Sequence, residues 1–455
     1  MLRRPFAPAL LALGAALACS PAGGPPNLLL VTLDTTRADH LGPYGYGRPT
    51  TPRLDALARD AVLYTRAVST SSWTLPAHAS LFTGRFPTSH GARYDPKGPL
   101  VLADAIQAPR AIRARGLSPG MQTLAGRLAA GGYDTAAVVG GPWLLRSFGL
   151  ADGFAHYDDA GITEYRGRRA EDVARGARAW LADWSDRDDG RPFFLFLNFY
   201  DPHFPYDPPP PHDRAFLPPG VEPDSRRRAQ WQALYDGEIR YVDQQLGSVL
   251  ELLDQRDLYD DTWIVVTSDH GELFGEHEEW GHGGHLYQEL VAIPLLVKAP
   301  GARGGGREDT GRVQIHQLFA LLLEAAGVGQ VDGPPLGEGL VLAEVNPMTA
   351  GDEDGGWRAI WDGTLKYHHH TLGGHRLHDL ERDPREQVNL LATRPEDAAR
   401  LRARLERELA SLPVPGPAGP DVEVDAETRA ALERLGYLGS EAAAEESGRP
   451  GGEAP

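Results

Sequence analysis

The sequence has a single cysteine, Cys19, among its 455 residues, so it cannot form an internal disulfide. It also lacks any block of lysine and arginine, and its formal net charge is −18. Nucleic-acid binding needs clustered basic side chains that neutralise phosphates, so we expect no nucleic acid as a partner. The negative charge does not exclude a small anionic substrate, because a local positive pocket can operate inside an acidic protein.

The start of the chain has no apolar run long enough to cross a membrane. Residues 6–18 are mostly apolar, whereas a spanning helix needs about 20 such residues. Two arginines precede the run and small residues follow it, which predicts a signal peptide over residues 1–18. We therefore expect an exported protein, periplasmic or at the cell surface.

Residues 16–19, "ALAC", are similar to the lipobox of bacterial lipoproteins. On this interpretation Cys19 is the lipidated first residue of the mature chain, residues 19–26 form a tether, and the lipid anchors the protein to the membrane. The alternative is an ordinary cleaved signal followed by an incidental cysteine.

Five apolar runs predict strands that are buried on both faces: residues 27–34, 134–140, 192–200, 262–269 and 292–299. Amphipathic segments predict helices between and after them, at residues 51–62, 238–255 and 315–327. Such alternation is typical of a mainly parallel sheet sandwiched by helices, so the predicted fold class is α/β. We assign residues 27–345 to this domain.

The pattern changes at about residue 346. Short strand-like pieces and a Gly-Gly turn predict a small β-rich C-terminal subdomain over residues 346–412, closed by a helix at 395–412. Within it, the three histidines at 368–370 predict an exposed strand, with a metal-binding role as the minor alternative. Residues 413–455 form a tail that we expect to be partly disordered.

Acids and histidines follow the ends of three predicted strands. Asp34 ends the first run, Asp201 and His203 follow the third, and Asp269 and His270 end the fourth. Ligands of open α/β sheets bind beyond the carboxyl ends of strands. One such acid alone would be read as a turn or a helix cap, but Asp34, Asp269 and His270 together predict a site for a divalent cation.

Thr74, in "SSWTLPAHASLFTG" (71–84), can supply a fourth ligand oxygen. The segment predicts a helix with Thr74 as its N-cap and Pro76 in its first turn. The backbone N–H groups of that helix start favour an anion. A cation beside the Thr74 oxygen would make it a better nucleophile, so Thr74 is both a predicted cap and a candidate nucleophile.

Several ordered motifs resemble the sulfatases of the alkaline-phosphatase superfamily. They are "NLLLVTLDTTRADHLGPYGY", "SSWTLPAHASLFTGRFPTSHG", "LNFYDPHFPY", "VTSDHGELFGEHEEWGHGGH" and "LHDLERDPREQVNLL", with a further likeness in "ETRAALERLGYLG" at 427–439. The similarity covers about residues 27 to 392. The resemblance implies the sulfatase fold and a metal-dependent hydrolase or transferase.

One departure from the family bears on the chemistry. Sulfatases have C-x-P-x-R or S-x-P-x-R, whose Cys or Ser is oxidised to formylglycine, whereas this chain has Thr74 and His78 in "TLPAH". A threonine cannot become formylglycine, and sulfate bound to a threonine has no easy route of release. A phosphorylated threonine can be cleaved by a second in-line attack at phosphorus. The resemblance therefore implies the sulfatase fold with phosphoester or phosphodiester chemistry.

Carried over by position, the metal ligands are Asp34, Thr74, Asp269 and His270. Sulfatases usually have a second Asp where Thr35 stands, and often an Asn where His270 stands. An imidazole in place of a carboxylate favours Zn²⁺ or Mn²⁺, with Ca²⁺ or Mg²⁺ as alternatives, for the one divalent cation that we expect. Whether a second active-site ion binds is left open.

Four further side chains are candidates for catalysis. The resemblance suggests that His78, His203 and His282 hold non-bridging oxygens and protonate the leaving group. Arg37 either stabilises developing charge or pairs with Asp39. A supporting position beside the ligands is open for two more histidines, His277 and His285.

The leading hypothesis is thus a cell-envelope hydrolase or transferase that forms a phospho-Thr74 intermediate. Its partner would be a small anionic ester, or an envelope glycan or lipid headgroup. One alternative is a sulfate-ester hydrolase, and another is an inactive lipoprotein that binds an anion.

Overall fold

The computed structural model describes residues 24–95, 100–102, 112–162, 167–187, 190–329, 336–346 and 355–413. Cys19, the signal peptide at 1–18 and the segment 427–439 lie outside these ranges.

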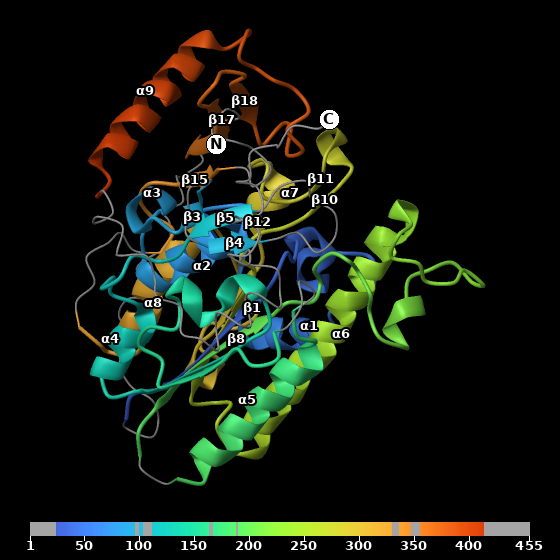
Figure 1. The fold of residues 1–455 in the computed structure, drawn as a ribbon, viewed down its shortest axis with the longest axis vertical. Coiled ribbons are helices and arrows are strands. Elements are labelled where there is room, and N and C mark those ends of the chain that lie inside the picture. The colour runs from blue at the N-terminus through green and yellow to red at the C-terminus, as the bar shows by residue number, and fades with distance from the viewer. Residues whose placement is uncertain are drawn as a thin grey trace, which may run out of the picture.

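A nine-stranded sheet forms the centre of the protein (Figure 1). Its strand order is β12-β2-β13-β9-β1-β8-β6-β7, and β14 pairs with β2 outside this path. The strands are β1 (Asn27–Leu33), β2 (Val62–Val68), β6 (Asp134–Val139), β7 (His156–Asp158), β8 (Phe193–Phe199), β9 (Thr262–Thr267), β12 (Ala292–Ile293), β13 (Leu295–Lys298) and β14 (Arg307–Gln314). β1 lies between β8 and β9 and is parallel to both, so the carboxyl ends of these three strands meet at one edge.

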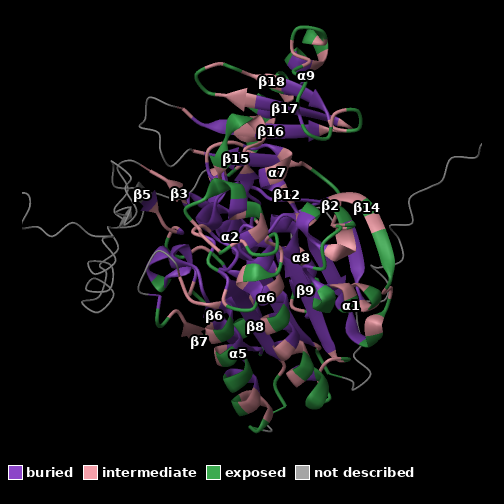
Figure 2. Ribbon diagram, turned by 90° about the vertical axis from the view of Figure 1, so that its right-hand side faces the viewer, coloured by how far each residue is buried: buried purple, intermediate pink, exposed green. Residues whose placement is uncertain are grey.

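Helices cover both faces of this sheet, and its central strands are buried between them (Figure 2). One face packs against α1 (Pro52–Asp60), α5 (Ala170–Ser185) and α6 (Arg228–Gln255). The other packs against α2 (Thr74–Thr83), α4 (Leu124–Ala130) and α8 (Leu318–Ala325). Apolar residues at successive positions of β1 point alternately into these two cores, which explains its continuous apolar run.

The predicted α/β class with a mainly parallel sheet is confirmed. The run at 292–299 behaves differently from the other four. It is interrupted at Pro294 and forms β12 and β13, which are antiparallel to β2. Proline has no N–H for a sheet ladder, so the break falls where the sequence forbids a continuous strand.

Several short elements complete the catalytic domain. A two-stranded ribbon, β10 (Leu273–Phe274) and β11 (Trp280–Gly281), follows β9. A small sheet contains β3 (Arg93–Tyr94), β4 (Leu100–Leu102) and β5 (Ile112–Arg115). The short helices are α3 (Pro87–His90) and α7 (Gln288–Val291).

The C-terminal part is a four-stranded antiparallel sheet with a helix on its outer face (Figure 1). It consists of β15 (Leu342–Val345), β16 (Trp357–Asp362), β17 (Leu365–His370), β18 (Arg376–Asp379) and the helix α9 (Pro395–Ser411). Its first strand begins at Leu342, a few residues before the boundary expected at 346. The outer face packs on α9, and the inner face packs on residues that follow β9 and β11 of the catalytic domain.

This two-sided packing corrects one expectation from the sequence. The strand at 368–370 was expected to be exposed, but His368 is 2% exposed. It lies on the inner face of β17, against the catalytic domain, because residues alternate between the two faces of a strand.

Candidate active site

Three predicted ligands meet at the carboxyl ends of β1 and β9. Asp34 directly follows β1, and Asp269 and His270 follow β9 after one intervening residue. One ligand atom of each side chain lies within 4.8 Å of those of the other two, and all three residues are fully buried. The register of two adjacent parallel strands therefore brings together residues that are more than 230 positions apart.

The carboxylate oxygens of this cluster are short of hydrogen-bond donors. Both oxygens of Asp34 and Oδ2 of Asp269 have no hydrogen-bond partner, whereas Oδ1 of Asp269 accepts the N–H groups of Thr35 (3.1 Å) and His270 (2.9 Å). Burial and the nearby Asp269 carboxylate raise the pKa of Asp34 well above its usual range. Two buried carboxylates with unpaired oxygens fit a bound cation, which would compensate their charge. The residues present thus fit a divalent ion.

The imidazole of His270 is held in the tautomer that a cation requires. Its Nδ1 donates to the carbonyl of Gly271 at 2.9 Å, so Nε2 carries the lone pair. Burial lowers the pKa of His270 to about 4, which keeps the ring neutral at pH 7. Nε2 lies 3.3 Å from Oγ1 of Thr74 and 3.3 Å from Oδ2 of Asp269.

Thr74 joins the cluster from the first position of α2, and this corrects the predicted cap. The N-cap is Trp73, whose backbone is extended (φ −145°, ψ 140°) and whose carbonyl accepts the N–H of Ala77. Thr74 already has a helical conformation, and Pro76 occupies the third helical position. The hydroxyl of Thr74 therefore makes no capping bond and faces His270 instead.

His78 supports Thr74 from one helical turn further on. Its Nδ1 donates to the carbonyl of Thr74 at 2.9 Å, so its Nε2 accepts the hydroxyl of Thr32 at 3.0 Å. The amide of Asn198 in turn donates to the Thr32 hydroxyl at 3.1 Å. Burial lowers the pKa of His78, in keeping with a neutral ring. Both ring nitrogens thus have partners within the protein and fix the start of α2, and the catalytic role expected for His78 stays a prediction.

His203 and His282 lie beside the cluster. The ring centre of His282 is 4.6 Å from that of His270 and 5.1 Å from that of His203. His203 stacks on Tyr200 at 4.4 Å and donates from Nδ1 to the carbonyl of Phe204 at 2.7 Å. Burial and the neighbouring His282 lower the pKa of His203 well below its usual value, so this imidazole is neutral.

The pKa of His282 is shifted in the opposite direction, because of an acid that was not predicted from the sequence. Its Nδ1 lies 3.0 Å from Oε1 of Glu272, whose Oε2 accepts the hydroxyl of Tyr206 at 2.8 Å. Burial alone would lower the pKa of His282, but the Glu272 carboxylate raises it above its usual value. The pKa values of two neighbouring imidazoles are thus shifted in opposite directions. The signal in the sequence was the acid two residues after His270, in "DHGE".

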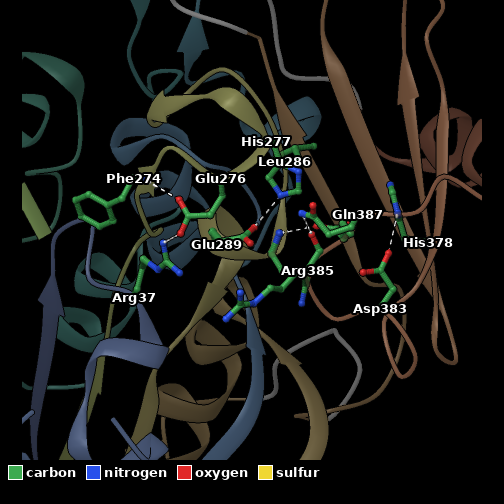
Figure 3. A network of polar contacts seen from close by, with 12 residues as sticks. Arg37, Phe274, Glu276, His277, Leu286, Glu289, His378, Asp383, Arg385 and Gln387 are labelled. Carbon is green, nitrogen blue, oxygen red and sulfur yellow. Dashed lines mark hydrogen bonds and ion pairs between the residues drawn. The ribbon is translucent and has the colours of Figure 1, made fainter. Parts of the chain in front are cut away.

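Arg37 is engaged by neighbouring acids, among them Glu276 (Figure 3). Its guanidinium pairs with Asp39 at 2.8 Å and with Glu276 at 2.7 Å, and it also donates to the backbone carbonyl of Glu272 at 3.0 Å. The pairing with Asp39 is therefore present. A role of Arg37 in stabilising developing charge stays a prediction.

The remaining histidines of this region belong to the joint with the C-terminal sheet. His277 stacks on Tyr287 with ring centres 3.6 Å apart, and its Nε2 is 3.3 Å from Glu289 (Figure 3). His285 packs at 5.3 Å from the same tyrosine and pairs with Glu279 at 3.5 Å. Neither histidine is bonded to a ligand of the cluster in these contacts.

Two more polar residues at the strand ends have structural partners. Asp201 accepts the N–H of Ala170 at 2.7 Å, at the start of α5. Its carboxylate therefore has a structural role at a helix terminus. Thr35 has a left-handed backbone (φ 50°), and its hydroxyl donates to the carbonyl of Pro202. Its hydroxyl therefore does not join the proposed metal ligands. Its backbone N–H donates to Oδ1 of Asp269.

Within the described part of the chain, no helix combines the length and the apolar character that a membrane span requires.

Comparison with known proteins places this geometry among known folds. Residues 26–328 match the family model described as Sulfatase. The ulvan-active sulfatase of Formosa agariphila is 26% identical over 444 residues, covering 85% of this chain and 81% of that protein. The solved phosphonate monoester hydrolase of Agrobacterium radiobacter has a TM-score of 0.66 at 22% identity, covering 85% of this chain and 95% of that one. A structure in complex with its substrate D-glucosamine-2-N,6-O-disulfate has a TM-score of 0.70 at 17% identity, covering 88% and 100%. The two likenesses to solved structures establish a shared fold.

Proposed function

The chain belongs to the sulfatase family of the alkaline-phosphatase superfamily and is a hydrolase of sulfate or phosphate esters, and from that premise we propose that it cleaves a phosphoester or phosphodiester through a covalent phospho-Thr74 intermediate. The observation that carries this proposal is the position of the Thr74 hydroxyl. It is released from helix capping and lies 3.3 Å from His270 in the anionic donor cluster.

The identity of the nucleophile favours phosphorus over sulfur. Threonine has no primary alcohol or thiol that could be oxidised to formylglycine, and a sulfated Thr74 would have no ready exit. A phosphorylated Thr74 is open to attack by water at phosphorus, opposite the threonine oxygen. The shared fold with a phosphonate monoester hydrolase is consistent with a substrate that contains phosphorus.

We propose Asp34, Asp269, His270 and Thr74 as the residues that hold one divalent cation, with Zn²⁺ or Mn²⁺ preferred because an imidazole is among the donors. Bound there, the ion supplies Lewis-acid stabilisation of negative charge during the transfer. The chain's own residues supply positioning. His78 and Thr32 fix the first turn of α2, and Gly271 fixes the ring of His270.

The two neighbouring imidazoles divide the proton transfers. In the first half, the Thr74 hydroxyl gives its proton to solvent, a bond forms from Oγ1 to phosphorus, and the bond from phosphorus to the leaving oxygen breaks. His282, charged through Glu272, donates its proton to that oxygen. In the second half, neutral His203 accepts a proton from the water that attacks phosphorus, the bond from phosphorus to Oγ1 breaks, and Oγ1 takes up a proton from solvent to restore the Thr74 hydroxyl. His203 then loses its proton to solvent, and His282 regains one. An alcohol in place of water would make the same enzyme a transferase.

A sulfate-ester hydrolase is the second candidate, because relatives such as the ulvan-active sulfatase carry that name. Membership in a hydrolase family, together with the donor cluster, argues against an inactive anion-binding lipoprotein.

The cell-envelope role is part of the same proposal. The export signal at 1–18 and the lipobox-like Cys19 support a lipid-anchored enzyme that meets anionic esters, glycans or lipid headgroups outside the inner membrane.

A substrate panel tests the choice of ester. The purified enzyme, supplied with Zn²⁺, Mn²⁺ or Ca²⁺, is assayed with matched aryl phosphate, phosphodiester, phosphonate and sulfate esters, and Thr74→Ala serves as the blank. We expect turnover of the phosphorus esters, carried by Thr74, and only background with the sulfate. Fast sulfate-ester turnover by the wild type would move the protein to the second candidate.

A further inference from the structure

A second cluster of buried, ligand-type side chains lies in the C-terminal part of the chain. His368 on β17, His378 on β18 and Glu386 in the following loop each offer one ligand atom, and these atoms all lie within 4.8 Å of one another. The three residues are only 2–3% exposed. Both histidines are on the inner face of the C-terminal sheet, toward the catalytic domain.

His378 is a buried histidine whose ring nitrogens lack hydrogen-bond partners. Neither of its ring nitrogens has a hydrogen-bond partner, although the side chain is 98% buried. The nearest acid is Asp383, whose Oδ2 is 3.9 Å from Nδ1, beyond hydrogen-bond distance (Figure 3). Buried polar groups in native proteins are nearly always bonded, and an exception calls for a reason such as an ion.

The protonation states of the cluster suit a cation. Burial lowers the pKa of His368 to about 4 and also lowers that of His378, so both rings carry a lone pair at neutral pH. Burial alone would raise the pKa of Glu386, but Lys366 and His368 hold it well below its usual range. Zinc binds the deprotonated forms of such ligand atoms, so binding here displaces the proton held between His368 and Glu386.

We propose that His368, His378 and Glu386 bind one zinc ion, which fastens the C-terminal sheet to the catalytic domain. Two imidazole nitrogens and one carboxylate oxygen form a donor set that favours Zn²⁺ over Ca²⁺ or Mg²⁺. Without the ion, Nε2 of His368 lies 2.7 Å from Oε1 of Glu386, as in a hydrogen bond. Zinc replaces the proton between these two atoms, and that proton moves to the other ring nitrogen or to solvent.

Glu386 explains why the ion would act at the joint between the two parts. Its Oε2 accepts the N–H of Gln288 at 2.7 Å, so this one carboxylate contacts both the C-terminal sheet and the start of α7. Lys366 bonds the same carboxylate at 3.0 Å and also donates to the carbonyl of Leu286. The ammonium opposes a cation, and the carboxylate of Asp383 offsets part of that repulsion. We therefore expect a structural site.

The test measures zinc content and thermal stability in the full chain without a histidine tag. The background variant is Asp34→Asn/Asp269→Asn, which disables the active-site cluster and leaves the second cluster intact. After chelator treatment and dialysis against zinc, this background should retain about one zinc per chain, and its unfolding midpoint should rise with zinc. Adding His378→Leu, which fills the space of the imidazole, should abolish both effects.

His369→Ala is the matched control. It belongs to the same strand, on the face toward α9, and should leave zinc content and the zinc-dependent midpoint unchanged. Should His378→Leu fail to fold, His368→Gln in the same background must show the same loss of zinc. A background variant that retains no zinc, or one whose zinc is unaffected by these changes, overturns the proposal. Since no readout is enzymatic activity, this outcome is independent of the chemistry proposed at Thr74.

Discussion

Oγ1 of Thr74 lies 3.3 Å from Nε2 of His270, with both side chains fully buried. The two residues come from α2 and from the loop after β9, 196 positions apart. The other groups of each residue are already used, since the Thr74 carbonyl accepts from His78 and the His270 Nδ1 donates to Gly271. What remains is one hydroxyl and one lone pair facing each other beside two carboxylates.

Thr74→Ala should lower kcat/KM for a phosphorus ester by roughly 10⁴-fold or more, because the cluster has no other hydroxyl to attack. Since Thr74 makes no capping bond, stability should change by about 1 kcal/mol or less. Thr74→Ser should retain part of the activity, because a primary hydroxyl can take the same position. Steady-state kinetics with thermal unfolding as the control measures both. A folded Thr74→Ala enzyme of near wild-type rate would exclude Thr74 as nucleophile.

Asp269→Asn and His270→Ala should each lower the bound-metal content by about one ion per chain and reduce activity in parallel. Each change removes a donor from a set that has unpaired, buried oxygens. Elemental analysis of protein purified without chelators gives the content. His156→Ala, an exposed histidine on β7, is the control and should change neither quantity. Activity that survives complete loss of the ion would argue against a metal at this cluster.

Proton donation by His282 predicts the alkaline limb of the pH profile. The acid must be protonated, so kcat/KM should fall as the pH rises through the pKa of His282, which Glu272 holds above its usual value. Glu272→Gln removes that charge while burial remains, so the fall should begin at a lower pH. Tyr206→Phe keeps the carboxylate and should shift the limb far less. An alkaline limb that is identical in wild type and Glu272→Gln would remove His282 from this role.

Cys19→Ala should move the protein from the membrane fraction to the soluble fraction of the envelope, because the proposed lipid has no other attachment point on this chain. Fractionation with immunodetection measures the partition, and Ser20→Ala is a neighbouring control that should stay in the membrane. Unchanged partition of Cys19→Ala would eliminate the lipoprotein hypothesis and leave an ordinary cleaved signal.

The ligand cluster could be predicted because each ligand follows an apolar run. Asp34 and Asp269 mark the carboxyl ends of buried parallel strands, and adjacency of β1 and β9 then sets their distance. The fold class followed from the same runs. Thr74 was added to this set as a hydroxyl oxygen at the start of a predicted helix, and α2 does bring it there.

Sequence spacing does not reveal several of the partners that the structure shows. His78 bonds to Thr32, and Arg37 bonds to Glu276, 239 positions away. Thr74 was displaced from the cap by one residue because the extended backbone of Trp73, rather than side-chain chemistry, decides where α2 begins. His368 is buried because both faces of β17 are covered, which a run of three histidines cannot indicate.

Trapping the intermediate tests the central claim most directly. The wild-type enzyme is quenched in acid during turnover of a phosphodiester or aryl phosphate, digested, and analysed by mass spectrometry, with Thr74→Ala treated identically. The account predicts one added phosphoryl group on the peptide that contains residues 71–84, located on Thr74 and absent from the variant. Turnover of the same ester without any phosphoryl group on Thr74, under conditions that trap a control phosphoenzyme, would contradict it.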